Sequence, residues 1–267
     1  MDNYQHYLEA ELGLWLYEMK KPPALFHRLT HAVQGKINEI IPEKVHRAIT
    51  LAIENMVKAV ITGSGWIVPK YDAALSIQER ETKIRERIKW YRNSASVEGA
   101  VTGAGGILLG LADFPVFLTI KMKMLFDIAS LYGKSTSDLQ ERFFILYLFQ
   151  LAFSSQQRRN DIIGLIENWD AYKQDLPMHL NDYDWKTFQL DYRDYLDLAK
   201  LAQMVPLIGA PIGAVVNYRL TEHLGRFAMN GYRLRNQAEL LISDVVKIAK
   251  KTGIPIKQKT LKYSGFC

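Results

Sequence analysis

The sequence predicts an all-α fold, a multi-helix bundle, on three observations. Apolar residues recur at helical spacing along nearly all of the 267 residues. The alternating β-branched runs that mark strands are almost absent. The chain is 48% hydrophobic and 23% charged, which is the composition of a globular protein and too apolar for a disordered one. Because no repeat or low-complexity linker divides it, we expect one helical domain over 1–254 and a short lysine-containing tail over 255–267.

Three helices are predicted before residue 65. The first covers residues 3–20 and ends before Pro22-Pro23, because proline cannot continue a helix interior. A second is expected over 24–40. A third begins at Pro42, which suits a first helical turn, and ends at Gly63. The first helix carries one apolar side made of Tyr7, Leu8, Leu12, Trp15, Leu16 and Met19.

Two capping boxes mark further helix starts. Ser76 and Glu79 open a charged helix over 76–92, which we expect to be a solvated surface helix with a narrow buried stripe. That stripe consists of Ile77, Ile84, Ile88 and Tyr91. Ser137 and Gln140 open a helix over 137–153 that is apolar nearly all round, so it is central in a bundle or faces lipid. The last helix is expected over 234–251.

The segment 97–120 is rich in glycine and has 14 uncharged residues between Glu98 and Asp113. Glycine costs a helix roughly 1 kcal/mol relative to alanine, and close packing against another helix can compensate for this. Asp113 followed by Pro115 indicates a break and a new helix start. One helical face would carry the glycines Gly99, Gly103, Gly106 and Gly110.

A second apolar segment, 201–218, has no charge and contains the pair Gly209 and Gly213, interrupted by Pro206 and Pro211. Two such segments could dock on each other as buried helices, or form a hairpin that enters or lies in a membrane. A regular two-pass membrane protein is a third alternative. The 14 uncharged residues of the first segment span only ~21 Å as a helix, short of the ~30 Å hydrocarbon core, so two buried central helices are expected.

Both glycine-rich blocks resemble the signature of the EcsC family. The first reads E-G-A-x-T-G-A-G-G from Glu98, then L-G-L-A-D-x-P from Leu109 and L-Y-G from Leu131. The second reads G-A-x-I-G-A-V-V-N-Y from Gly209, followed by Gly225-Arg226. The resemblance is clearest over 80–254. It implies a bacterial helical protein of a family named after a protein encoded beside an ABC transporter. The family brings no assigned reaction, so no catalytic residues carry over.

The sequence contains none of the catalytic, nucleotide-binding or metal-binding motifs that we considered. Gly133-Lys134-Ser135 lacks the first glycine of a P-loop, and Gly103-Ala104-Gly105 lacks the third glycine of a dinucleotide-binding turn. His27 and His31 share a helix face but have no third ligand nearby. The single cysteine, Cys267, excludes a disulfide framework and a cysteine zinc site. We therefore assign no catalytic residue, cofactor or metal.

Polar residues around the second block allow two interpretations. They form structural ion pairs, such as Glu98 or Asp113 with Arg219 or Arg226, or they line a polar site for a small molecule. The set consists of Glu98, Asp113, Asn217, Arg219, Glu222, His223 and Arg226. The acidic and aromatic stretch 167–198 adds an expected rim of half-buried rings, or alternatively a surface for a protein partner.

The net charge of +6 lies in the last 21 residues, which hold six lysines and no acid. The rest of the chain has 28 bases and 28 acids, so a nucleic-acid partner is not expected. These lysines either contact anionic lipid or solubilise a frayed end. They are Lys247, Lys250, Lys251, Lys257, Lys259 and Lys262.

These features predict a non-enzymatic helical protein at a membrane surface, accessory to a transporter or secretion system. With no secretory signal at the start of the sequence, we expect a cytoplasmic protein that is peripheral at the inner face of the membrane. A membrane surface or a membrane protein is the expected partner. The alternatives are a small-molecule binder or enzyme with a site between the glycine-rich blocks, and a soluble scaffold for protein interactions.

Overall fold

A computed structural model describes residues 3–20, 43–63, 65–104, 114–154, 156–176 and 210–252. Within these ranges the regular structure is entirely helical and no strand is present, which confirms the predicted all-α class. The described helices are α1 (Asn3–Lys20), α3 (Glu43–Thr62), α4 (Ile77–Ala104), α6 (Phe114–Leu131), α7 (Leu139–Phe153), α8 (Gln156–Glu167), α9 (Trp169–Tyr172) and α12 (Ala210–Thr252). The helix predicted over 24–40 and the histidines His27 and His31 lie outside them.

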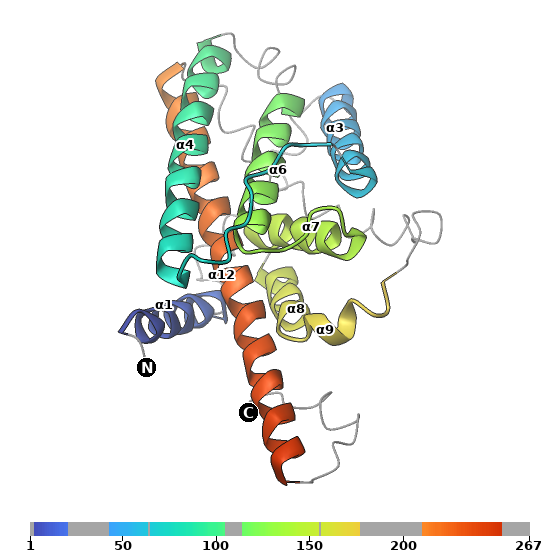
Figure 1. The fold of residues 1–267 in the computed structure, drawn as a ribbon. Helices are drawn as coiled ribbons and strands as arrows, with labels where there is room; N and C mark the ends of the chain where they lie inside the picture. The colour runs from blue at the N-terminus through green and yellow to red at the C-terminus, as the bar shows by residue number, and fades with distance from the viewer. Residues whose placement is uncertain are drawn as a thin grey trace.

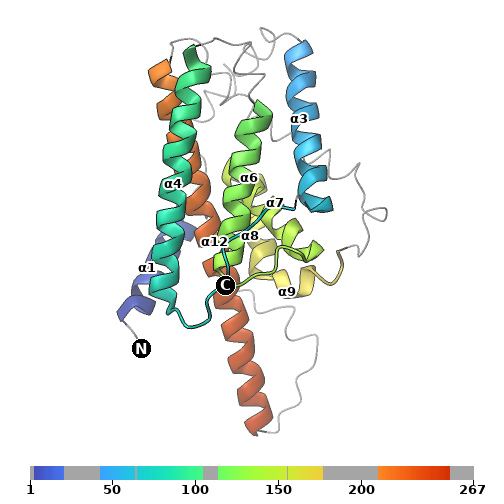
Figure 2. The same cartoon turned by 45° about the horizontal axis from the view of Figure 1, so that its top comes forward.

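The longest helices, α4 and α12, run antiparallel and side by side (Figures 1 and 2). Their contact is the most extensive between any two described helices. Helix α1 lies below the lower end of α4 in Figure 1, where it contacts α12 and α8. The side of α1 that faces the body buries Leu8, Leu12, Trp15 and Met19, as predicted, whereas Tyr7 is exposed. Helix α1 therefore packs near the first turns of α4 and against the middle of α12, through the contacts of Glu11 with Arg233 and Trp15 with Phe227.

The core lies around α6 and α7. Helix α6 packs against α3, α4 and α12, and α7 packs against α12, α8 and α3. Every residue from Phe143 to Phe153 is buried, so the all-round apolar helix is central in the bundle and surrounded by protein. Aromatic rings fill the junction with α12, where Phe144 lies 5.0 Å from Tyr232 between ring centroids.

The two predicted capping boxes have different outcomes. At α4, the Ser76 backbone N–H donates to the Glu79 carboxylate at 2.8 Å, and the Glu79 N–H donates to Ser76 Oγ at 3.3 Å, so this box is confirmed. At α7 the N-cap residue is Asp138, and no side chain caps the helix. Gln140 instead donates to the carbonyl of Lys173, 3.0 Å away, because the chain after α9 supplies an acceptor for its amide. The second capping box was therefore wrong.

The C-terminal helix differs most from the expectation. We predicted a helix over 234–251, separate from the segment 201–218, but α12 is continuous from Ala210 to Thr252. Pro211 does not interrupt it because it lies in the first turn, where a missing N–H breaks no helical hydrogen bond. Helix α6 begins at Phe114, which agrees with the new helix start predicted at this point, whereas Asp113 itself lies outside the described residues. Pro206 lies outside the described residues.

Close helix packing at glycine occurs within the described residues, at positions other than those predicted. A Cβ atom on Gly225 of α12 would lie 2.7 Å from the side chain of Ile88 on α4. One on Gly231 would lie 2.2 Å from a methyl group of Leu148 on α7. Of the glycines predicted to pack closely, Gly99, Gly103 and Gly213 lie in helices whose surroundings at these positions are not described, and Gly106, Gly110 and Gly209 lie outside the described ranges.

No helix in the described part of the chain combines the length and the apolar character that a membrane crossing requires.

Candidate functional site

A buried ion pair joins α4 to α12. The guanidinium of Arg233 donates to both oxygens of the Glu81 carboxylate, with N–O distances of 2.8 and 2.7 Å. Glu81 has no exposed surface, and Tyr132 on the segment after α6 donates a further hydrogen bond to it at 3.0 Å. A bidentate pair of this kind fixes both the distance and the orientation of the two groups. It therefore sets the register of α4 against α12.

Helix α1 is attached to the same ion pair. Tyr4 donates to the Glu81 carboxylate at 2.9 Å, and Arg85 donates to the Tyr4 hydroxyl at 2.7 Å. Glu11 accepts a hydrogen bond from Arg233 at 2.9 Å. Burial alone would raise the pKa of the Glu81 carboxyl, but the hydrogen bonds and charge of Arg233, with the two tyrosine hydroxyls, hold that pKa below its usual value.

The lowered pKa of Glu81 predicts an acid-dependent loss of stability. Unfolding returns this carboxyl to a pKa of about 4.3, so its contribution is present above that pH and is lost as the pH falls toward the folded-state pKa. We expect the difference in unfolding free energy between the wild type and Glu81→Gln to shrink from pH 7 to pH 4. Urea unfolding at both pH values measures it. A difference that does not change with pH would contradict the assignment.

Two further buried carboxylates have their own partners. Glu141 of α7 accepts hydrogen bonds from Tyr232 and Arg235 of α12 at 2.6 and 2.7 Å. Asp127 of α6 accepts from Arg87 at 2.8 Å and Tyr91 at 2.7 Å, and it also pairs with Lys123. Because each carboxylate is satisfied by basic and hydroxyl groups of neighbouring helices, these clusters stabilise the bundle and are not open to a ligand.

A pocket of about 330 Å³ lies between α1, α4 and α12, next to the Glu81–Arg233 pair. Its apolar part consists of the buried side chains Ile88 and Met229. Its polar lining consists of the basic residues Arg85, Lys89, Arg92, Arg226 and Arg233, the acids Glu11 and Glu222, and Asn230. Basic groups therefore outnumber acidic ones in a body that is neutral as a whole.

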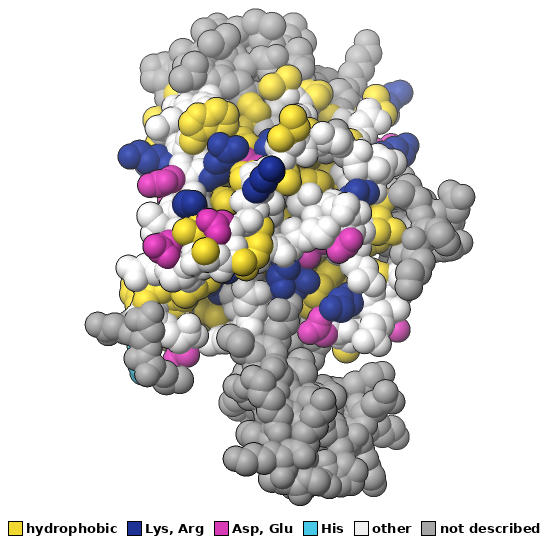
Figure 3. All heavy atoms as spheres, viewed as in Figure 1, with side chains coloured by type: hydrophobic (Ala, Val, Ile, Leu, Met, Phe, Trp, Pro, Cys, Tyr) yellow, Lys and Arg dark blue, Asp and Glu magenta, His cyan; other side chains and the backbone are white. Residues whose placement is uncertain are grey.

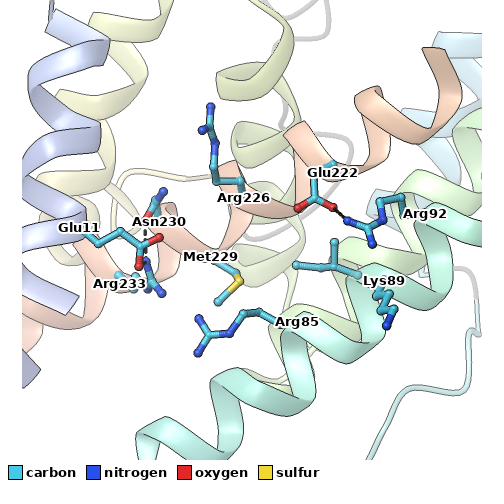
Figure 4. A pocket seen from close by; sticks show the side chains of 10 residues that line it. Glu11, Arg85, Lys89, Arg92, Glu222, Arg226, Met229, Asn230 and Arg233 are labelled. Atoms are coloured by element: carbon cyan, nitrogen blue, oxygen red, sulfur yellow. Dashed lines mark hydrogen bonds and ion pairs between the residues drawn. The ribbon is translucent and has the colours of Figure 1, made fainter. Parts of the chain in front are cut away.

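Figure 4 shows how these groups are arranged. At one end Arg92 donates to Glu222 at 2.6 Å, and at the other Arg233 binds Glu11 and Asn230, both at 2.9 Å. The labelled side chain of Met229 lies between Arg226 and Arg85. Within the described residues, neither Lys89 nor Arg226 has an ion-pair or hydrogen-bond partner, and both are exposed. These two cations are therefore available to a ligand.

The structure separates the polar residues predicted around the second glycine-rich block. Glu222 and Arg226 lie one helical turn apart and line the pocket together. His223 points to another surface, where its Nε2 lies 2.8 Å from the carbonyl of Ala152 and its ring 4.2 Å from that of Phe227. Arg219 is exposed, and the Asn217 carbonyl accepts a hydrogen bond from Thr221. The side chains of Glu98 and Asp113 are not described, nor are those of the six tail lysines.

The histidine of the predicted polar set is bound by the backbone. Burial, together with the charges of Arg159 and Arg226, lowers the pKa of His223, so its imidazole is neutral at pH 7 and is held by Ala152. No group of three or more His, Cys, Asp or Glu side chains in the described part of the chain could hold a metal ion. The chemistry that the pocket supports is the binding of an anion.

Sequence reasoning missed most of this pocket. Arg85, Lys89 and Arg92 belong to the helix that we expected to be a solvated surface, and spacings of three and four residues place them on one side of it. On α12, Glu222, Arg226, Met229 and Arg233 follow the same spacing. This periodicity was readable in the sequence, but the pairing of the two faces depends on the tertiary contact of α4 with α12.

Comparison with known proteins identifies the family. The model of the EcsC protein family matches residues 8–236, and the chain belongs to this family. The match includes residues 8–75, which the sequence motifs did not cover. The chain is 43% identical to "Protein EcsC" of Bacillus subtilis (strain 168) over 222 residues, which are 83% of this chain and 91% of that protein.

A second relative is less similar. The chain is 32% identical over 149 residues to "Uncharacterized protein YdbA" of the same strain, covering 56% of this chain and 55% of that protein. No solved structure matches the chain.

Proposed function

We propose that this protein is a non-enzymatic binding protein that associates with the surface of an anionic membrane through the outer face of α4. One observation carries the proposal. Trp90 is 56% exposed on that face, where the Arg87 guanidinium lies 5.6 Å from its ring centroid and the exposed acid Glu86 is one turn before it. Tryptophan is enriched at membrane interfaces because its ring is apolar and its N–H is polar. An exposed tryptophan among cations suits the headgroup region of a bilayer.

The charge distribution on α4 supports this placement. Between residues 79 and 93 the helix carries six basic residues and three acids. One acid, Glu81, is buried and paired with Arg233, so it does not offset the outer charge. Three of these basic residues, Arg85, Lys89 and Arg92, line the pocket on the side of α12, and the other three are Arg80, Lys83 and Arg87. Lys83 precedes Trp90 by seven residues, which places both on the same exposed face two helical turns apart.

The surface view agrees with a local contact. Over α4, at the left of Figure 3, Lys and Arg side chains lie beside hydrophobic ones, with Asp and Glu interspersed. Each basic residue near an anionic membrane contributes about 1 kcal/mol, so a few cations with one interfacial ring give reversible attachment. A peripheral attachment of this kind would allow the protein to act as an accessory to a membrane-protein partner. The lysines of 247–262 would add to the same attraction.

Vesicle flotation tests the proposal. We expect the full chain to float with vesicles that contain anionic lipid and not with purely zwitterionic ones. Lys83→Glu removes one attraction and adds one repulsion, each about 1 kcal/mol, so binding should weaken by about tenfold or more. A chain that ends at Val246 separates the contribution of the tail. The matched control is Lys58→Glu on α3, which lies on the other side of the bundle in Figure 1 and should bind as the wild type does.

Tryptophan fluorescence locates the contact. Brominated lipids should quench part of the emission of the full chain, and that quenching should be absent in Trp90→Phe. Absence of flotation with any anionic vesicle, or quenching that is unchanged in Trp90→Phe, would contradict the proposed membrane contact through α4.

A further inference from the structure

We propose that the pocket between α1, α4 and α12 binds the phosphate group of a phosphate monoester, with Arg226 and Lys89 as its direct ligands. The inference does not depend on membrane attachment through the outer face of α4. Lys89 lies about 100° around the helix from Trp90, and the pocket faces α12 instead of the outer surface. The ligand group can belong to a soluble metabolite or to a lipid headgroup, and the experiment below distinguishes the two.

Charge is the first argument. Five basic side chains line the pocket, and Glu11, Glu222 and the buried Glu81 lie against them, which leaves an excess of two positive charges. A phosphate monoester carries about −1.5 to −2 at pH 7. A single carboxylate would leave at least one cation uncompensated. The pocket therefore matches a dianionic group better than a carboxylic acid.

The second argument is that the two ends of the site are already organised. Arg92 and Arg233 are held by Glu222 and Glu11 at the two ends, so their positions are fixed before a ligand arrives. In Figure 4 the side chains of Arg226 and Lys89 extend away from Met229 in opposite directions, so both turn inward when they bind one phosphate. Arg226 and Lys89 have no ion pair or hydrogen bond elsewhere in the described part of the chain. A guanidinium donates two parallel hydrogen bonds to phosphate, and an ammonium adds a point charge.

The third argument concerns the rest of the ligand. Ile88 and Met229 form an apolar patch beside the cations, and both are buried apart from this opening. Inorganic phosphate would leave that patch without a contact, whereas the carbon chain of an ester could cover it. About 330 Å³ accommodates a phosphate with a short organic group. An ester should therefore bind more tightly than inorganic phosphate.

Isothermal titration calorimetry on the full chain tests the site, with glycerol phosphate, inorganic phosphate and acetate as probes at equal ionic strength. We expect glycerol phosphate to bind most tightly and acetate not to bind. Arg226→Gln and Lys89→Gln should each weaken glycerol phosphate binding by at least tenfold, and Arg226→Lys should retain part of it. Both positions are exposed and unpaired within the described residues, so these variants should fold normally. Lys83→Gln, on the same helix outside the pocket, should change nothing.

Vesicles distinguish the source of the phosphate. If a lipid supplies it, wild type should prefer phosphatidic acid, a monoester, over phosphatidylglycerol, a diester, at equal surface charge, and the pocket variants should lose this preference. Equal binding to both lipids together with calorimetric binding of glycerol phosphate identifies a soluble ligand. Lys83→Glu should weaken binding to both vesicles equally, so failure of the membrane contact remains separable. Absence of glycerol phosphate binding, or unchanged binding by Arg226→Gln and Lys89→Gln, would overturn the proposal.

Discussion

Arg233→Met is expected to lower the free energy of unfolding by about 3–5 kcal/mol. Methionine preserves much of the side-chain volume, so the main loss is that of the partner of a fully buried carboxylate. Glu81 would keep its tyrosine donors but lose two charged hydrogen bonds, and Glu11 on α1 would lose its contact as well. Urea unfolding at pH 7, followed by circular dichroism, measures the change.

A double-mutant cycle isolates the ion pair from the rest of the substitution. In Glu81→Gln/Arg233→Met both charges of this buried pair are removed, so the double variant should be more stable than Arg233→Met alone. The glutamine carbonyl still accepts a hydrogen bond from Tyr132 or Tyr4. Lys58→Met, which removes a partner from an exposed pair on α3, should cost less than about 1 kcal/mol. Strictly additive effects of the two substitutions in the cycle would show that the pair contributes no coupling.

The second large effect is expected at Gly225. A leucine there would place its side chain inside the space occupied by Ile88, since even a Cβ would lie 2.7 Å from that residue. Either α4 and α12 separate or both side chains leave their preferred rotamers, and overpacking of this kind costs typically 1–3 kcal/mol and occasionally more. Thermal unfolding of Gly225→Leu, compared with the wild type, measures the loss. Gly225→Ala should lose less, because alanine gains about 1 kcal/mol of helix propensity.

Gly164 provides the matched control. It also lies within a helix, α8, but a Cβ added there meets nothing within 4 Å. Gly164→Ala should therefore stabilise the protein by about 0.5–1 kcal/mol through backbone entropy alone. Ile88→Ala should partly rescue Gly225→Ala, because it removes the atoms that the new methyl group meets. If Gly225→Ala stabilises the protein as much as Gly164→Ala does, then α4 and α12 do not pack closely at Gly225.

Several elements could be predicted from local pattern because their causes are local. Helix α1 has the predicted bounds, since an apolar stripe and a proline pair define it within twenty residues. The α4 capping box formed because both partners are three residues apart. The Gln140 box failed because Lys173, which is distant in sequence, offered a competing acceptor. The length of α12 was underestimated because Pro211 was taken as an interruption, although in a first turn it is compatible with the helix.

The candidate site could be predicted from the sequence less completely than the fold. Glu222 and Arg226 were selected from the sequence, but they were grouped with His223, which helical geometry turns toward α7 and the Ala152 carbonyl. Glu81 and Arg85 were recognised only as a helical pair worth a few tenths of a kcal/mol. The main partner of Glu81 is Arg233, which is 152 residues away and joins it only when α4 and α12 pack. No local rule indicates such a pair.

The charge of the protein also depends partly on the sequence alone and partly on the tertiary structure. Composition alone established that the excess of six positive charges lies in residues 247–267 and that the remaining chain is neutral. Neutrality in a sum does not imply neutrality at each point of a surface. Folding buries the carboxylates Glu81, Asp127 and Glu141 beside their partners, and it brings five basic side chains together around one pocket. Helical periodicity is a property of neighbours in sequence and could be read directly, whereas this separation of charge arises from contacts between helices and required the tertiary structure.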